Sequence, residues 1–137
     1  MSRLKRFGVS IEEKVLKNFD SYIKKKKYPT RSKAISDLIV KELVKHEWLK
    51  GNTVVGVISL VYNHHKRDIV EKLTDIQHDF YDVIISSQHI HLDHNNCFEI
   101  VIVRGKPDKI KNLSEKLAGT KGVKYSNLTA AITGKNI

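Results

Sequence analysis

The most constraining feature of this sequence is a single predicted strand, followed by two predicted helices, in its first 48 residues. Apolar and polar side chains alternate over Lys5–Ile11, as in a strand with one buried face. Ser10 and Glu13 have the spacing of a capping box, which predicts a helix start. Thr30 is suited to cap a second amphipathic helix, which we expect to end near Trp48.

A lone strand leaves its backbone hydrogen-bonding groups without partners, and a segment this short rarely forms a sufficient core. A second copy would solve both problems by pairing the two strands as an antiparallel ribbon over four helices. The sequence therefore predicts an obligate dimer through residues 1–49, which we interpret as the first domain.

The positive charge is concentrated in this predicted domain. The chain has 25 basic and 15 acidic residues, and 14 of the basic but only 6 of the acidic ones lie in residues 1–50. Such asymmetry indicates a polyanionic partner, with nucleic acid or an acidic membrane surface as the candidates. A solvated basic surface around a structural dimer is the alternative interpretation, and the lysine run at residues 24–27 alone would favour it.

Two groups of residues favour double-stranded DNA. On the predicted ribbon the outward positions would be Arg6, Gly8 and Ser10, and a β-ribbon fits the major groove, where Arg and Ser can contact base edges. The second helix begins Thr30-Arg31-Ser32 without an acidic residue, so its free amides could donate hydrogen bonds to a phosphate.

Residues 50–137 predict a second domain with a different pattern. Strands are expected over 53–62, 83–92, 97–104 and 123–132, and helices over 66–80 and 107–117. The order is β-α-β-β-α-β, the ferredoxin-like unit, so the fold class is α+β. No apolar run is long enough to cross a bilayer and no secretory signal is recognisable, and the single cysteine fits a reducing compartment, so we expect a cytoplasmic protein without a membrane partner.

A cluster of histidines points to a metal. Six of the seven lie between His64 and His94. His89 and His91 alternate on one predicted strand, so both imidazoles project from one face, and the hairpin returns with Cys97 beside them. His78 and Gln77 end the preceding helix. This donor set suits Zn, Cu or Ni, and sequence does not fix the geometry. Alternatively, the histidines form an ordinary surface pair and the cysteine is a small core residue.

Together these features resemble the nickel-responsive transcriptional regulator family, NikR. The resemblance covers nearly the whole chain and is carried by the segments YPTRSKAISDLI, VYNHHKRD, IQHDFYD, HIHLDHNNCFEI and KGVKY. It implies a ribbon-helix-helix DNA-binding domain followed by a ferredoxin-like domain of the ACT type. It also implies a homotetramer, in which a tetrameric metal core is flanked by two ribbon-helix-helix dimers.

The resemblance further implies roles for individual residues. Ni(II) would be held in square-planar geometry by His89, His91 and Cys97 of one protomer and His78 of a neighbour. Hydrogen bonds around these ligands would come from Gln77 and Glu99. DNA contacts would come from Arg6, Gly8, Ser10, Thr30, Arg31, Ser32, Lys66 and Arg67. The family often has a small hydroxyl residue where this chain has Gly8, which changes the expected operator sequence.

The expected function is a nickel-dependent repressor of nickel-uptake genes that binds a palindromic operator, with His64, His65 and His94 as candidates for secondary metal sites. Two alternatives remain open at this point. One is a zinc-dependent enzyme, for which Glu99 would be the acid or base, although nucleotide-binding loops and G-x-S-x-G are absent. The other is a regulator that senses an amino acid through its ACT-type domain.

Overall fold

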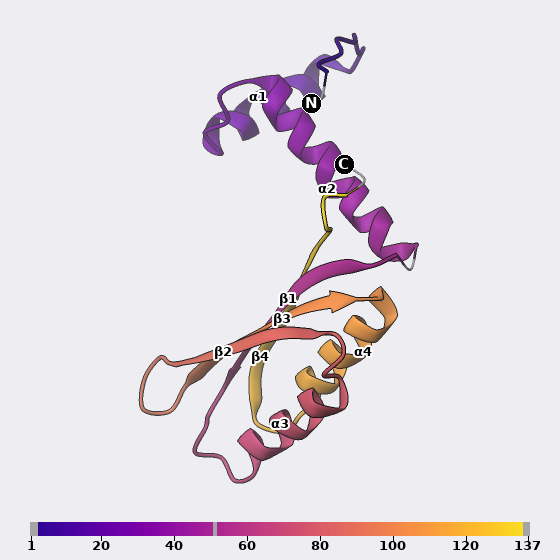
Figure 1. The fold of residues 1–137 in the computed structure, drawn as a ribbon. Coiled ribbons are helices and arrows are strands. Elements are labelled where there is room, and N and C mark those ends of the chain that lie inside the picture. Colours follow the sequence, from indigo (N-terminus) through magenta and orange to yellow (C-terminus); the bar gives the residue numbers. More distant parts are fainter. Residues whose placement is uncertain (1–2, 51, 136–137) are drawn as a thin grey trace. The chain divides into compact units, whose positions relative to one another are not determined.

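The computed structural model describes residues 3–50 and 52–135, which divide into two compact units, one up to Lys41 and one from Glu42 onward (Figure 1). The predicted boundary after residue 49 is untested by this division and stays a prediction. The elements, in chain order, are α1 (Glu13–Lys25), α2 (Arg31–Leu49), β1 (Val54–Tyr62), α3 (Ile69–Asp79), β2 (Ile84–His91), β3 (Cys97–Gly105), α4 (Pro107–Ala118) and β4 (Val123–Ala131).

The second unit is built on one antiparallel sheet with the strand order β2-β3-β1-β4. Figure 1 shows α3 and α4 on the same side of this sheet. The β-α-β-β-α-β order predicted from the sequence is therefore confirmed. Alternate residues of β1 and β3 face the helices and form the core with one face of each helix. Its fully buried members include Ile58, Leu60, Val101, Val103, Ile69, Leu73, Ile110, Leu113 and Leu117.

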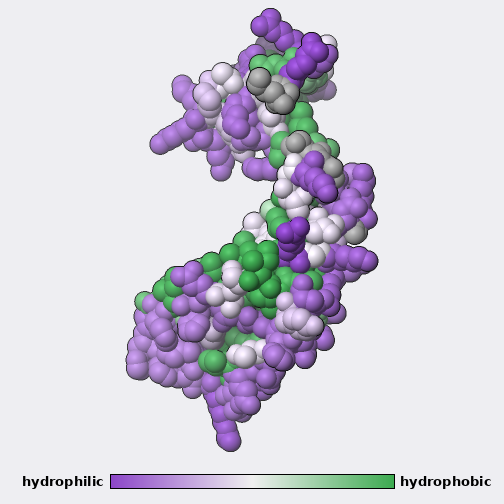
Figure 2. Space-filling model, in the orientation of Figure 1, coloured by the Kyte–Doolittle hydropathy of each residue, from purple (hydrophilic) through white to green (hydrophobic). Residues whose placement is uncertain are grey.

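The other face of the sheet is also apolar but is less well covered. Phe98, Ile100 and Ile102 alternate with the core positions of β3 and are only partly buried. On the edge strand β2, Ile85 and Ile90 are 59% and 49% exposed. In Figure 2 an apolar patch is visible on this unit, in the area where Figure 1 shows the sheet. A strand that is apolar on both faces is typical of a sheet covered by a second layer.

The last turn of α2 belongs to the second unit. Trp48 donates a hydrogen bond from its indole Nε1 to the backbone oxygen of Ala131, at 2.8 Å, and packs against the core. Gly56 lies beneath the indole, where an added Cβ would be 3.4 Å from the Trp48 ring and 3.0 Å from the carbonyl oxygen of Thr129. No helix in the described part of the chain is long and apolar enough to cross a membrane.

The first unit departs from two sequence predictions. Residues 3–11 form no strand, and Phe7 and Val9 are 73% and 66% exposed. The strand is absent because a single chain supplies no second strand to satisfy its backbone groups. The capping box at Ser10 is also wrong, since α1 begins at Glu13 with Glu12 as its N-cap and has no side-chain cap. The cap on α2 is confirmed, because Thr30 Oγ1 accepts a hydrogen bond from the amide of Lys33 at 3.1 Å.

The lysine run ends α1 in a Schellman motif. The amide of Tyr28 donates to the carbonyl oxygen of Ile23, and that of Lys27 donates to Lys24, at 3.0 and 3.1 Å. Lys27 has φ +61°, a conformation that glycine adopts without a steric cost. A side chain here is therefore retained at the expense of local backbone strain.

We expect Lys27→Gly to stabilise the first unit by about 0.5–1 kcal/mol, because it relieves the left-handed conformation. The matched control is Lys25→Gly, two residues earlier within α1, which should cost about 1 kcal/mol. Urea unfolding at fixed protein concentration, followed by far-ultraviolet circular dichroism, measures both. Equal destabilisation by the two variants would contradict the Schellman assignment.

Candidate metal centre

The β2–β3 hairpin brings three of the predicted metal ligands to one cavity. In the strand register, His91 lies opposite Cys97 and His89 lies opposite Glu99. Cys97 and Glu99 are on the helix-facing side of β3 and are buried. The two imidazoles and the thiol therefore line a cavity of about 370 Å³, whose other walls include Gln77 and Thr74 of α3.

The donors share this cavity without being drawn together. The rings of His89 and His91 lie 6.0 Å apart, both side chains are exposed, and Cys97 is a free thiol that is 1% exposed. Over residues 3–50 and 52–135, no three His, Cys, Asp or Glu side chains are close enough to hold a metal ion. Their chemistry nevertheless fits a borderline divalent ion, since imidazole and thiolate are the ligands that Zn, Cu and Ni prefer.

A buried carboxylate borders the cavity. Glu99 is 8% exposed, and its two oxygens accept hydrogen bonds from the Tyr62 hydroxyl at 2.6 Å and from Gln77 Nε2 at 2.8 Å. Burial and the neighbouring carboxylate raise the pKa of Tyr62 well above its usual value. The phenol therefore stays protonated and continues to donate. Gln77 and Glu99, both predicted to surround the ligands, meet directly.

His78, the fourth predicted ligand, follows Gln77 on α3 but faces a different pocket. It is exposed in the last turn of α3 and lines a different, more open pocket of about 280 Å³ with Thr74, Gln77, Tyr81 and Ile84. It does not line the cavity that His89, His91 and Cys97 share. A single chain thus brings three of the four predicted ligands to one cavity and presents the fourth on its surface.

Three further histidines form a row that leads to the cavity. The ring centroid of His64 is 4.5 Å from that of His91 and 4.1 Å from that of His65, and His65 and His94 are 4.7 Å apart. Burial and the neighbouring imidazoles lower the pKa of His64. Its Nδ1 is buried without a hydrogen-bond partner among the residues described.

The sequence did not predict that Tyr62 lines this cavity and binds Glu99. It also did not predict that His64 lines the same cavity. For Tyr62 a signal was available, because it falls at a core-facing position at the end of β1, where a buried hydroxyl needs a partner.

The predicted DNA-binding residues are all on the surface. Arg6, Gly8 and Ser10 lie in the exposed N-terminal segment. Thr30, Arg31 and Ser32 are exposed at the start of α2, and Lys66 and Arg67 are exposed in the loop before α3. Arg31 is already engaged, since its guanidinium donates two hydrogen bonds to Asp20, at 2.8 and 2.7 Å, and lowers the pKa of that carboxyl. The sequence did not reveal this pairing, because Asp20 comes from α1.

We expect Tyr62→Phe to destabilise the second unit by about 1–3 kcal/mol, because it leaves one oxygen of a buried carboxylate without its donor. Tyr125→Phe is the control, since Tyr125 is 55% exposed and should change stability by less than about 0.5 kcal/mol. Chemical denaturation compares the two. Equal effects would mean that Glu99 does not depend on the phenol.

The chain is similar to known proteins over nearly its whole length. Residues 55–131 match the family model described as the NikR C terminal nickel binding domain. A Syntrophus aciditrophicus protein that carries the name "putative nickel-responsive regulator" is 51% identical over 135 residues, covering 98% of both chains. Another, of Chlorobaculum tepidum, is 49% identical over 129 residues, covering 94% of this chain and 96% of the relative.

One solved structure shares the fold alone. An uncharacterized protein of Thermotoga maritima superposes with a TM-score of 0.53 at 16% identity, covering 58% of this chain and 98% of that one. The full-length similarity and the matched domain identify the chain more specifically. The chain belongs to the NikR family of nickel-responsive regulators.

Proposed function

We propose that this protein is a Ni(II)-dependent DNA-binding repressor of nickel-uptake genes. The carrying observation is that one hairpin directs two imidazoles and a thiol into a single cavity, in a chain similar over nearly its whole length to nickel-responsive regulators. Its partner is a palindromic double-stranded operator. Because that operator is genomic DNA, the protein acts in the cytoplasm.

The proposed nickel ligands are His89, His91 and Cys97 of one protomer and His78 of a neighbouring protomer. Support for the shared site comes from His78, which is exposed and outside its own chain's cavity. A square-planar Ni(II) ion would supply four coordination bonds that crosslink the protomers. The exposed histidines can change rotamer, whereas the buried Cys97 cannot move without disturbing the core.

Exposed apolar side chains on α3 and on the edge strand β2 support an assembly of several chains. Four apolar side chains are exposed here: Val70 on α3 (49%), Tyr81 in the turn after α3 (76%), and Ile85 (59%) and Ile90 (49%) on β2. Burying such side chains contributes roughly 25 cal/mol per Å² of apolar area. We therefore propose a homotetramer formed through the second unit of four chains and flanked by two ribbon-helix-helix dimers.

Gln77 and Glu99 position the helix that carries His78. The Gln77 amide donates a hydrogen bond to the buried carboxylate of Glu99 and so connects α3 to β3. Gln77 directly precedes His78, and Glu99 lies two residues after Cys97. Fixing β3 therefore also restricts the position of α3, because α3 cannot shift without breaking its hydrogen bond to the buried Glu99 carboxylate. The link would orient both halves of the proposed site.

The N-terminal segment supplies the proposed sequence reader. Phe7, Val9 and Ile11 are 73%, 66% and 47% exposed, which is the apolar face that a second copy would cover on forming a ribbon. Arg6, Gly8 and Ser10 would then point into the major groove. Thr30, Arg31, Ser32, Lys66 and Arg67 would contact phosphates, and Arg31 would have to share its guanidinium with Asp20.

The structure disfavours the enzyme alternative. Glu99 is the only candidate acid or base that the sequence offered, and both of its oxygens accept hydrogen bonds from Tyr62 and Gln77. With both oxygens already accepting a hydrogen bond and only 8% of the residue exposed, Glu99 is better suited to hold β1 and α3 in place than to exchange a proton with a substrate. We therefore propose a regulator rather than a catalyst.

We expect nickel binding, followed by equilibrium dialysis and Ni(II)–thiolate absorption, to be lost in Cys97→Ala and in His78→Ala. His46→Ala is the control and should bind as the unsubstituted chain does, because His46 is exposed on α2. Co-refolding the two defective variants should restore about a quarter of the sites, since random mixing pairs an intact His78 with an intact Cys97 at that frequency. No recovery would contradict a site shared between protomers.

DNA binding should separate two kinds of residue. We expect Arg6→Ala to reduce discrimination between operator and random DNA by about 1–3 kcal/mol, because it removes a base contact. Lys66→Ala should weaken both kinds of DNA alike and reduce the salt slope by about 1, because it removes a phosphate contact. Filter binding across a salt series tests both. Unchanged discrimination in Arg6→Ala would show that the ribbon does not read the operator.

A further inference from the structure

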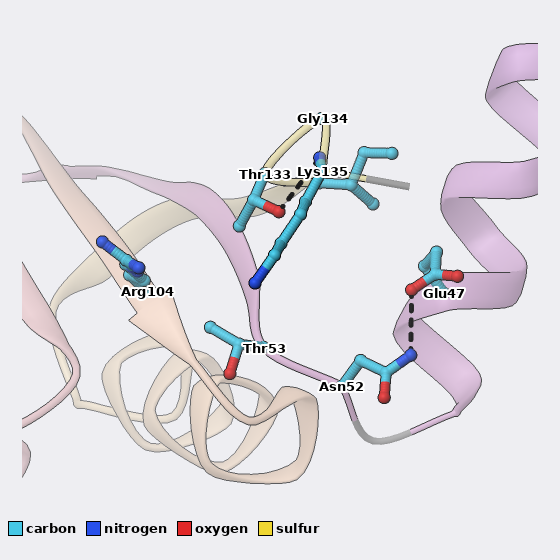
Figure 3. A pocket seen from close by; sticks show the side chains of 8 residues that line it. Glu47, Asn52, Thr53, Arg104, Thr133, Gly134 and Lys135 are labelled. Carbon is cyan, nitrogen blue, oxygen red and sulfur yellow. Dashed lines mark hydrogen bonds between the residues drawn. The ribbon is translucent and has the colours of Figure 1, made fainter. Parts of the chain in front are cut away.

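A second cavity, remote from the histidines, lies in the second unit. Its volume is about 520 Å³, which is within the range of small-molecule sites. Figure 3 shows side chains reaching it from the last turn of α2, the segment before β1, the end of β3 and the segment after β4. The lining residues are Glu47, Asn52, Thr53, Arg104, Ile132, Thr133, Gly134 and Lys135.

Two cations face this cavity without acidic partners. Neither Arg104 nor Lys135 forms an ion pair with a described acidic side chain, whereas Arg31, Lys33 and Lys109 elsewhere in the chain each do. Figure 3 shows the Lys135 side chain extending across the cavity, with its ammonium on the side of Arg104 and Thr53. Both cations line the same cavity, and an anion bound between them would be attracted by both.

Hydrogen bonds define the backbone from which both cationic side chains extend. Arg104 lies opposite Val55 in the sheet, and its amide donates to the carbonyl oxygen of Val83 at 2.8 Å. Gly134 has φ +81°, a conformation that side-chain-bearing residues rarely adopt, and it turns the chain so that Lys135 faces back. The amide of Lys135 also donates to Thr133 Oγ1, at 3.4 Å.

The rest of the lining favours an anion over an apolar ligand. Thr53 and Thr133 add hydroxyl donors, and Ile132 is the single apolar side chain among the described lining residues. The one acidic residue among the described lining, Glu47, lies on the helix side of the cavity beside Asn52 (Figure 3). Its Oε2 accepts a hydrogen bond from Asn52 Nδ2 at 3.0 Å. The cationic and anionic walls are therefore opposite each other, and the formal charge of the lining is positive.

We propose that this cavity is a binding site for a small, multiply charged oxyanion that carries phosphate or carboxylate groups. Arg104 holds one oxygen pair with its planar guanidinium, and Lys135 neutralises the remaining charge. The threonine hydroxyls donate to the other oxygens. The bound anion connects the segment after β4 to the end of β3, and the site is independent of the proposed nickel ligands and DNA contacts.

Isothermal titration of the full-length chain with inorganic phosphate and, separately, with succinate tests this assignment at constant ionic strength. We expect saturable binding of one anion per chain, with the tighter of the two identifying the ligand class. Arg104→Gln and Lys135→Gln should each weaken binding by about tenfold or more, and Arg104→Lys by less, because it keeps the charge but loses the paired hydrogen bonds.

The matched control is Lys72→Gln, which removes one positive charge from an exposed position on α3 outside the cavity. It should leave anion affinity unchanged, and nickel and operator binding should be unchanged in Arg104→Gln. An absence of saturable binding, or an equal loss in Lys72→Gln, would overturn the proposal. So would an Arg104→Gln variant that binds operator DNA more weakly but binds both small anions normally, since that outcome would assign the cations to DNA.

Discussion

Glu99 places a carboxylate on the buried face of β3, where an ionised group is costly unless donors surround it. The chain supplies one donor from β1 and one from α3, so a single side chain connects two strands and a helix. The cavity that contains the cysteine and two histidines lies directly beside this connection. Tyr62, Gln77 and Glu99 therefore keep their positions in its walls, because moving one of them would leave a buried polar group without its hydrogen bond.

The single chain is complete in its core but incomplete at its surfaces. The helix side of the sheet is closed by α3 and α4, whereas the opposite face, the edge strand and the N-terminal segment all expose apolar side chains. These surfaces coincide with the parts of the chain for which we propose partners: the metal core and the ribbon. One chain completes the core of the second unit, whereas for the first unit and for the assembly we propose contacts between chains.

The second unit could be predicted from sequence to within about three residues at each element end, because its patterns are periodic and its partners are close in sequence. The strand over 5–11 does not form, because a single chain supplies no second strand to pair with it. The predicted capping box was wrong because Ser10 and Glu13 have the right spacing, but α1 begins later, with Glu12 as its N-cap. The Arg31–Asp20 pair, the Tyr62–Glu99 bond and the oxyanion cavity join distant segments, and local patterns carry no record of such contacts.

Trp48 is the only tryptophan in the chain, and its indole is held at the last turn of α2 by the carbonyl of Ala131. The fluorescence emission of Trp48 therefore reports on one place, the end of α2, which lies within the second unit. A polar partner and a half-buried ring give the fluorophore a defined environment, which changes as soon as that turn leaves the sheet. The protein thus contains its own optical reporter in the part of α2 that belongs to the second unit, and no label has to be introduced to follow it.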